Sequence, residues 1–176
     1  MAKTKNKPNL IIIIDGLNEN KLNVFEQEIN DFVEKVGNSL KNKKKETNFY
    51  FLESYFTSLD SVEFKAKIHD VSFYDIVSEV LKKNLSRIKE SQTVIHIIHN
   101  TNDYIDTENK ETINKIILQI SKAQINFWTN ISANENKALD FGVVAEVYSP
   151  TSAGIQTMIS RMKDKTINFL KGKKDA

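Results

Sequence analysis

The stretch that decides the fold is LIIIIDGLNEN, residues 10–20. Its first five residues are apolar and mostly β-branched, and the mostly polar residues 15–20 follow at once. A short, unbroken apolar run that ends at a turn is typical of a strand buried on both faces, as at the centre of a parallel sheet. Open α/β sheets bind their ligands just past the carboxyl ends of such strands. The turn that begins at Asp15 is therefore the first candidate site.

The rest of the chain alternates between strand and helix patterns. Apolar residues at helical spacing predict helices over 25–40, 73–88, 113–120 and 155–170, with a shorter helix over 134–141. Runs rich in β-branched or aromatic residues predict strands over 47–56, 61–64, 93–98, 125–129 and 143–148. Gly172 is expected to end the last helix. This alternation predicts a doubly wound, mostly parallel, Rossmann-like α/β sheet with helices on both faces.

Length and composition indicate one globular domain. The chain has 176 residues, of which 40% are hydrophobic and 27% charged, and its net charge of +2 gives no reason to expect nucleic acid. We expect a basic tail over 1–9, a single domain over 10–172 and a short tail over 173–176. Cysteine is absent, which excludes a disulfide framework and a thiol nucleophile. The apolar runs are too short for a signal peptide or a membrane span, so a cytoplasmic protein without membrane contact is expected.

Three polar clusters are expected to meet at the carboxyl edge of the sheet, because the turns after central parallel strands converge there. They are Asp15, Asn18, Glu19 and Asn20; His69, Asp70, Ser72 and Asp75; and His99, Asn100, Asn102 and Asp103. Oxygen ligands of this kind suit Mg²⁺ or Mn²⁺. The same side chains also serve in turns and helix N-caps, where they accept hydrogen bonds from free backbone N–H groups. The capping interpretation is favoured, and the metal site stays open as the alternative.

Other catalytic signatures are missing from the sequence. It contains no G-x-S-x-G, Walker or G-x-G-x-x-G motif, so serine hydrolases, P-loop NTPases and dinucleotide-binding enzymes all lose support. The histidines are not spaced like a zinc motif. His96, inside an apolar strand, is expected to be a packed and hydrogen-bonded residue. Trp128 and Tyr148, near the ends of later strands, are expected to pack in the core or at its rim.

The order of these segments resembles a von Willebrand factor A (vWA) domain of the compact bacterial and phage type. The matching stretches are IIIIDGLNEN (11–20), VSFYDIV (71–77) and TVIHIIHNTND (93–103). The tail from residue 125 is similar to the family's closing strand, short helix, strand and long helix. The resemblance covers about residues 10–172, and it implies the layered α/β fold and a protein-binding role.

The resemblance also implies a metal-ion-dependent adhesion site, built in the family on a D-x-S-x-S loop, a later Thr and a later Asp. Position by position, Asp15 matches the leading Asp, Leu17 and Glu19 match the two Ser, Val71 matches the Thr and Asn100 the later Asp. Because Leu17 and Val71 have no side-chain oxygen, a degenerate site is expected. No metal or other cofactor is expected; a weakly bound Mg²⁺ or Mn²⁺ would use Asp15, Glu19 and Asn100.

The expected function is that of a non-catalytic module that binds a protein partner. The candidate binding edge consists of Asp15, Asn18, Glu19, Asn20, His69, Asn100, Asn102 and Tyr104. The alternative is an enzyme, since strand-Asp-Gly-x-Asn also resembles the opening of PIN- and NYN-type ribonucleases. In that case Asp15, Asp75 and Asp103 would hold Mg²⁺ or Mn²⁺ to activate water. Assembly into a homo-oligomer stays a further alternative.

Overall fold

The central sheet consists of four strands that run in the same direction. The computed structural model describes residues 9–14, 27–32, 34–36, 48–50, 56–58, 73–99, 107–120, 123–129, 145–149 and 151–172. The strands are β1 (Asn9–Ile14), β4 (Thr93–His99), β5 (Ala123–Thr129) and β6 (Ala145–Val147). They lie in the order β1-β4-β5-β6, and every neighbouring pair is parallel. The predicted parallel α/β sheet is confirmed.

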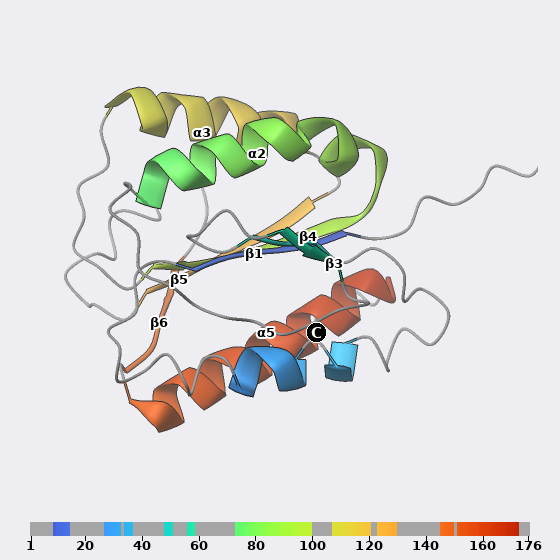
Figure 1. The fold of residues 1–176 in the computed structure, drawn as a ribbon, viewed down its shortest axis with the longest axis vertical. Helices are drawn as coiled ribbons and strands as arrows, with labels where there is room; N and C mark the ends of the chain where they lie inside the picture. Colours follow the sequence, from blue (N-terminus) through green and yellow to red (C-terminus); the bar gives the residue numbers. More distant parts are fainter. Residues whose placement is uncertain are drawn as a thin grey trace, which may run out of the picture.

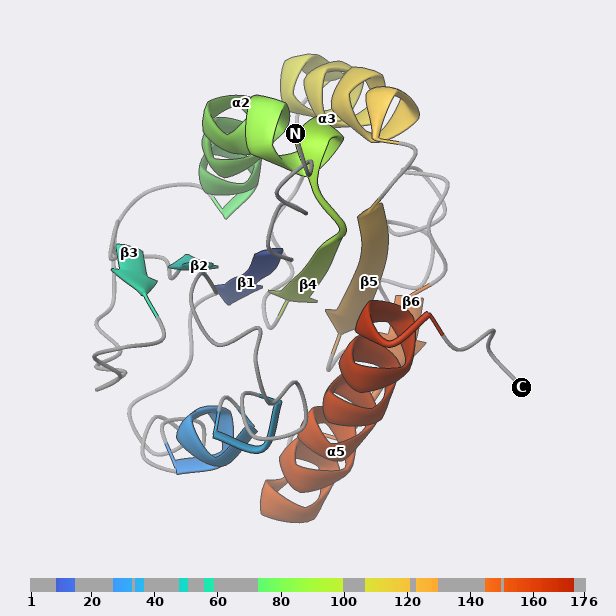
Figure 2. The same cartoon turned by 90° about the vertical axis from the view of Figure 1, so that its right-hand side faces the viewer.

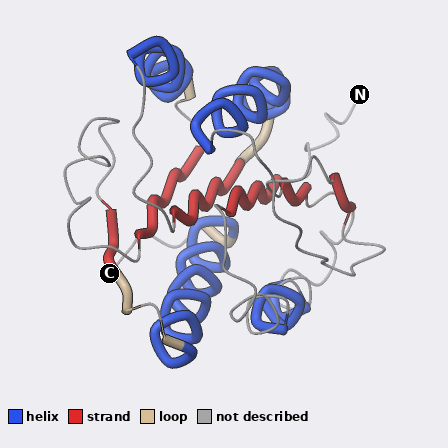
Figure 3. Tube along the Cα trace, turned by 60° about the vertical axis from the view of Figure 1, so that its left-hand side comes forward, coloured by secondary structure: helices blue, strands red, loops and turns tan. Residues whose placement is uncertain are grey.

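Helices cover both faces of this sheet (Figures 1 and 3). One face carries α2 (Phe73–Glu90) and α3 (Thr107–Gln119). The other carries α5 (Ser152–Leu170) and the helical residues 27–32 and 34–36. Two separate apolar cores result, one on each side of the strands. The molecule therefore has three layers, as the alternation of strand and helix patterns predicts.

The unbroken apolar run of β1 reflects its position between the two cores. Successive side chains of a strand point to opposite faces. Leu10 and Ile12 accordingly pack beneath α5, whereas Ile11 and Ile13 pack beneath α2 and α3. All four are at most 1% exposed. A strand that is buried on both faces favours apolar side chains at successive positions, which explains the unbroken apolar run over residues 10–14.

A short antiparallel pair, β2 (Asn48–Tyr50) and β3 (Phe56–Ser58), lies beside β1 (Figure 2). The prediction of one strand over 47–56 is wrong, because this range contains β2 and the first residue of β3. The sequence hides the break, since residues 51–55 include no Gly, Pro, Asn or Asp that would signal a turn. The strand predicted over 61–64 and the helix predicted over 134–141 lie outside the described residues.

The ends of α5 follow from two residues. Thr151 is the N-cap, and its hydroxyl accepts a hydrogen bond of 3.1 Å from the Gly154 N–H. At the other end Gly172 adopts a positive φ of 70°, and its N–H donates to the Phe169 carbonyl at 3.0 Å. Glycine adopts this left-handed conformation without a Cβ penalty. The prediction that Gly172 ends the helix is confirmed.

The first strand begins one residue before the predicted domain boundary. Asn9 falls in the predicted basic tail over 1–9, but it is the first residue of β1 and is only 5% exposed. Its side-chain amide donates to the Thr93 hydroxyl at 3.2 Å, and its backbone N–H donates to the Gln92 carbonyl at 2.8 Å. A polar residue can start a buried strand here because Thr93 of β4 and the preceding Gln92 accept hydrogen bonds from Asn9.

The helices α2, α3 and α5 run in the opposite direction to the strands of the sheet. Each helix that connects two parallel strands must return across the sheet, so it begins near the carboxyl end of the strand before it. Figure 1 shows α2, α3 and α5 beginning on the left, the side toward which β4 runs. The starts of three helices and the ends of the strands thus lie on the same side of the molecule.

Candidate functional site

The strands end at the same level of the sheet. Ile14 at the end of β1 pairs with Ile98 of β4, which pairs with Trp128 of β5, and Trp128 pairs with Glu146 of β6. Asp15 is the next residue after β1, and Asn100 is the next residue after β4. The two polar stretches therefore leave the sheet from neighbouring strands at one edge.

Most of the predicted site residues lie outside the part of the chain that the structure describes. These are Asp15, Asn18, Glu19, Asn20, His69, Asp70, Ser72, Asn100, Asn102, Asp103 and Tyr104. His99 is the last residue of β4, and Asp75 lies in the first turn of α2. What the structure adds is the geometry of the elements that surround the predicted edge.

A hollow of about 630 Å³ lies between α2 and α3, and its lining extends from the first turn of each helix to the middle of α2. Its lining is polar and consists of Asp75, Ser78, Glu79, Lys82, Lys83, Glu108 and Asn109. The Asn109 side-chain amide donates a hydrogen bond of 2.6 Å to the Asp75 carboxylate, which joins the first turns of the two helices. Because α2 and α3 begin on the side toward which the strands run (Figure 1), the first-turn residues of the hollow lie on that side of the molecule.

The charges in the hollow are separated along α2. Asp75 and Glu108 lie in the first turns of their helices, where a carboxylate also interacts favourably with the helix dipole. Lys82 and Lys83 lie about two turns further along α2. Among the described residues, no group of three or more His, Cys, Asp or Glu side chains is arranged to hold a metal ion. Because its carboxylates lie near the helix starts and its lysines lie further along α2, the hollow offers an acidic end and a basic end to a polar partner.

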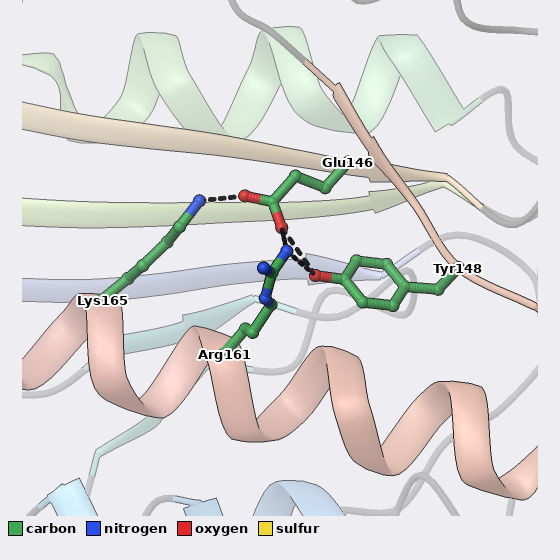
Figure 4. Close-up of polar contacts among 4 residues, drawn as sticks. All are labelled: Glu146, Tyr148, Arg161 and Lys165. Carbon is green, nitrogen blue, oxygen red and sulfur yellow. Dashed lines mark hydrogen bonds and ion pairs between the residues drawn. The ribbon is translucent and has the colours of Figure 1, made fainter.

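A second polar cluster joins the edge strand β6 to α5 (Figure 4). The Glu146 carboxylate accepts hydrogen bonds from the Tyr148 hydroxyl at 2.6 Å, from Arg161 at 2.9 Å and from the Lys165 ammonium. Arg161 also donates to the Tyr148 hydroxyl at 3.3 Å. The Lys165 ammonium lies 5.0 Å from the centre of the Trp128 ring, within the range of a cation–π interaction.

The pKa values in this cluster follow from its hydrogen bonds. Burial by itself would raise the pKa of the Glu146 carboxyl, but hydrogen bonds from Lys165 and Tyr148 outweigh burial and hold it below its usual value. Burial and the hydrogen bond to Glu146 raise the pKa of Tyr148 to about 12. Glu146 is thus ionised and Tyr148 is protonated near neutral pH, so each keeps the form that the cluster needs.

Replacing Glu146 with Gln is expected to reduce the free energy of unfolding by about 1 kcal/mol. The effect is modest because Arg161 is 62% exposed and is well solvated without its partner. Urea unfolding near neutral pH, compared with wild type, measures the loss. Asp164→Asn on the exposed face of α5 is the control and should change stability by less than about 0.5 kcal/mol. Equal effects of the two substitutions would contradict the role given to Glu146.

His96 is a packed residue of the core, as the sequence predicts. It is fully buried, and its Nε2 lies 2.7 Å from the Thr166 hydroxyl of α5. Burial, with a smaller contribution from the positive charge of Lys165, lowers its pKa to about 3. Trp128 is also fully buried, and Tyr148 is half-buried at the rim, so both expectations for these aromatic residues are confirmed.

Sequence reasoning missed the hollow and the Glu146 cluster. Two signals for the cluster were present: Glu146 lies two residues before Tyr148 on a predicted strand, and Arg161 and Lys165 lie four residues apart on a predicted helix. The sequence does not show that β6 pairs with β5, and it is this pairing that brings β6 and α5 together.

Comparison with known proteins gives no match to a protein-family model and none to a curated protein. Among solved structures, the chain is similar to an inactive zymogen of a C11 protease from Parabacteroides distasonis, with a TM-score of 0.51 and 11% sequence identity. The match covers 96% of this chain and 57% of that one, so the chain spans little more than half the length of this neighbour. At this identity the similarity shows the layered α/β fold alone.

One negative finding concerns membranes. Over the residues that the structure describes, no helix is both long enough and apolar enough to cross a bilayer.

Proposed function

We propose that this protein is a non-catalytic interaction module with a vWA-like fold, and that it binds a protein partner at the carboxyl edge of its sheet. The observation that carries the proposal is the hollow between α2 and α3, because it presents charged side chains from two helices that begin on the side toward which the strands run. Two neighbouring strands of the sheet, β1 and β4, lead to the candidate binding residues. Asn18, Glu19 and Asn20 follow β1, and Asn102 and Tyr104 follow β4.

The charges of the hollow indicate what kind of partner fits. Asp75, Glu79 and Glu108 favour a basic side chain near the starts of the helices, and Lys82 and Lys83 favour an acidic side chain further along α2. A partner segment with a basic side chain near the helix starts and an acidic side chain further along α2 would complement the charges that line the hollow. Such electrostatic complementarity gives specificity more than raw affinity.

The proposal also includes binding that does not depend on a metal ion. In the vWA resemblance, Leu17 and Val71 stand where the family uses a Ser and a Thr as ligands. Neither side chain can donate an oxygen to a cation. The partner is therefore expected to be held by side-chain and backbone contacts rather than through a shared ion.

Affinity capture from the native host, with identification of the captured proteins, tests the proposal. Two variants change the proposed surface: Asn18, Glu19 and Asn20 to alanine, and Glu79→Lys combined with Glu108→Lys. Each is expected to reduce the amount of a specific captured partner at least about tenfold, a typical effect of removing the central contacts of an interface. Capture by the wild-type protein should be the same in EDTA as in Mg²⁺.

A matched control keeps the change in charge but moves it elsewhere. Glu90→Lys at the end of α2, combined with Asp164→Lys on α5, introduces the same four units of positive charge on exposed positions. This control should retain the partner. A partner that persists with both surface variants, or that is lost in EDTA, would overturn the proposed binding edge or its independence from metal.

A further inference from the structure

Three buried nitrogen atoms gather beneath α5 without a hydrogen-bond partner. They are His96 Nδ1, Asn126 Nδ2 and Trp128 Nε1, and none has a partner among the residues that the structure describes. His96 and Trp128 are fully buried, and Asn126 is 7% exposed. Because a buried polar atom without a hydrogen bond costs about 1–3 kcal/mol, three such atoms in one place require an explanation.

The three side chains lie on one face of two neighbouring strands. His96 of β4 is the register partner of Asn126 of β5, so the two side chains point to the same face. Trp128 is two residues further along β5, hence on that face too, and its ring centre lies 6.0 Å from that of His96. Phe32 contacts His96 from the side, with ring centres 6.1 Å apart. Asn126 and Trp128 are thus both neighbours of the His96 ring.

Hydrogen bonds to α5 fix which nitrogen of His96 carries the proton. The Thr166 hydroxyl has one hydrogen, and it donates this hydrogen to the Met162 carbonyl at 2.7 Å. Thr166 must therefore accept the bond from His96, so that Nε2 carries the hydrogen. In the neutral ring this leaves Nδ1 as an acceptor. The three atoms without partners are consequently one acceptor and two N–H donors.

We propose that His96, Asn126 and Trp128 form a binding site for one internal water molecule. The water accepts hydrogen bonds from Asn126 Nδ2 and Trp128 Nε1 through its two lone pairs, and it donates one hydrogen to His96 Nδ1. Three hydrogen bonds are the usual number for a buried water. A cation would face two N–H donors, and an anion would face the lone pair of Nδ1. Water is the small ligand that satisfies both kinds of group.

The site has a structural consequence for α5. Water at Nδ1 stabilises the tautomer in which Nε2–H donates to Thr166, and so it supports the hydrogen bond that joins β4 to this helix. The site lies within the core between the sheet and α5, apart from the hollow between α2 and α3, and it does not depend on the proposed partner.

A crystal structure at a resolution that shows ordered solvent tests the site directly. The expected result is one water within hydrogen-bond distance of all three nitrogens in wild type, and no water there in Asn126→Leu. Protein atoms in that space, or an indole N–H that donates to a carbonyl instead, would overturn the proposal.

A thermodynamic cycle tests it independently in solution. Removing either donor weakens the binding of the same water molecule. Trp128→Phe should therefore lower Tm by about 2–4 °C more in the wild-type background than in the Asn126→Leu background. Circular dichroism follows the unfolding, since Trp128 is the single tryptophan. Equal decreases in Tm in both backgrounds would contradict a shared water. Should Asn126→Leu fail to fold, Asn126→Ser serves as the second background.

Discussion

Gly154→Ala destabilises the protein by about 2–3 kcal/mol, although alanine is the better helix former. A Cβ at this position would lie 2.5 Å from the Ser149 hydroxyl oxygen, 2.9 Å from the Ser149 carbonyl carbon, and closer still to the carbonyl oxygen. These carbonyl atoms belong to the backbone that enters α5, so they cannot move aside without displacing the start of the helix. The loss of stability is measured by urea unfolding, followed by the fluorescence of Trp128.

Gly172→Ala is the matched control for this prediction. A Cβ on Gly172 meets nothing within 4 Å, but its φ of 70° is unfavourable for alanine. The cost should be about 1 kcal/mol, from backbone conformation alone. A greater cost at Gly172 than at Gly154 would contradict the close approach of the chain at Ser149.

The stability of the protein is expected to fall as the pH decreases below about 6.5, because His96 is buried in its neutral form. Its pKa is lowered from 6.5 to about 3 in the folded state, so the unfolded chain binds a proton in this interval that the folded protein does not. Stability is fully present above pH 6.5 and is lost as the pH falls toward 3. Each pH unit costs about 1.4 kcal/mol, and the total over this interval approaches about 5 kcal/mol.

The measurement is the free energy of unfolding between pH 7 and pH 4.8. This range lies above the ordinary pKa of 4.5 for a glutamate, and therefore Glu146 contributes little to the change. His96→Leu is the comparison, since it keeps a buried apolar side chain and removes the titrating group. His69 and His99 are present in both proteins and cancel. The variant should lose stability more slowly with acid than wild type, and parallel slopes would show that another group titrates.

The elements of the sheet core could be predicted because their signals are local. The apolar runs of β1 and β4 and the helical spacing in α2 and α5 each lie within one continuous segment. The exception is the β2–β3 pair, because the residues between these strands include no Gly, Pro, Asn or Asp to mark clearly where the chain reverses. Strand propensity identifies the strand-forming residues of this region, but it does not show where one strand ends and the next begins.

The strand ends that border the candidate edge could be predicted, but the residues of the hollow could not. The polar residues after β1 and β4 indicate a carboxyl edge, because parallel strands that lie side by side end together. The contribution of Asn109 and Glu108 could not be foreseen, since Asn109 reaches Asp75 and Glu108 joins the lining of the hollow only after α3 packs against α2. Contacts between helices depend on how two surfaces meet, and no spacing within either helix encodes them.

The sequence by itself determined the three-layered α/β architecture, the burial of β1 on both faces and the end of α5 at Gly172. Each depends either on the spacing of apolar residues within one segment or on the backbone conformation of one glycine, and both are local properties of the chain. Only the tertiary structure decided that Glu146 meets Lys165, that His96, Asn126 and Trp128 share one buried face, and that α2 and α3 form a polar hollow. These features join residues far apart in the chain, so they depend on strand register and helix placement, which follow from packing of the whole core.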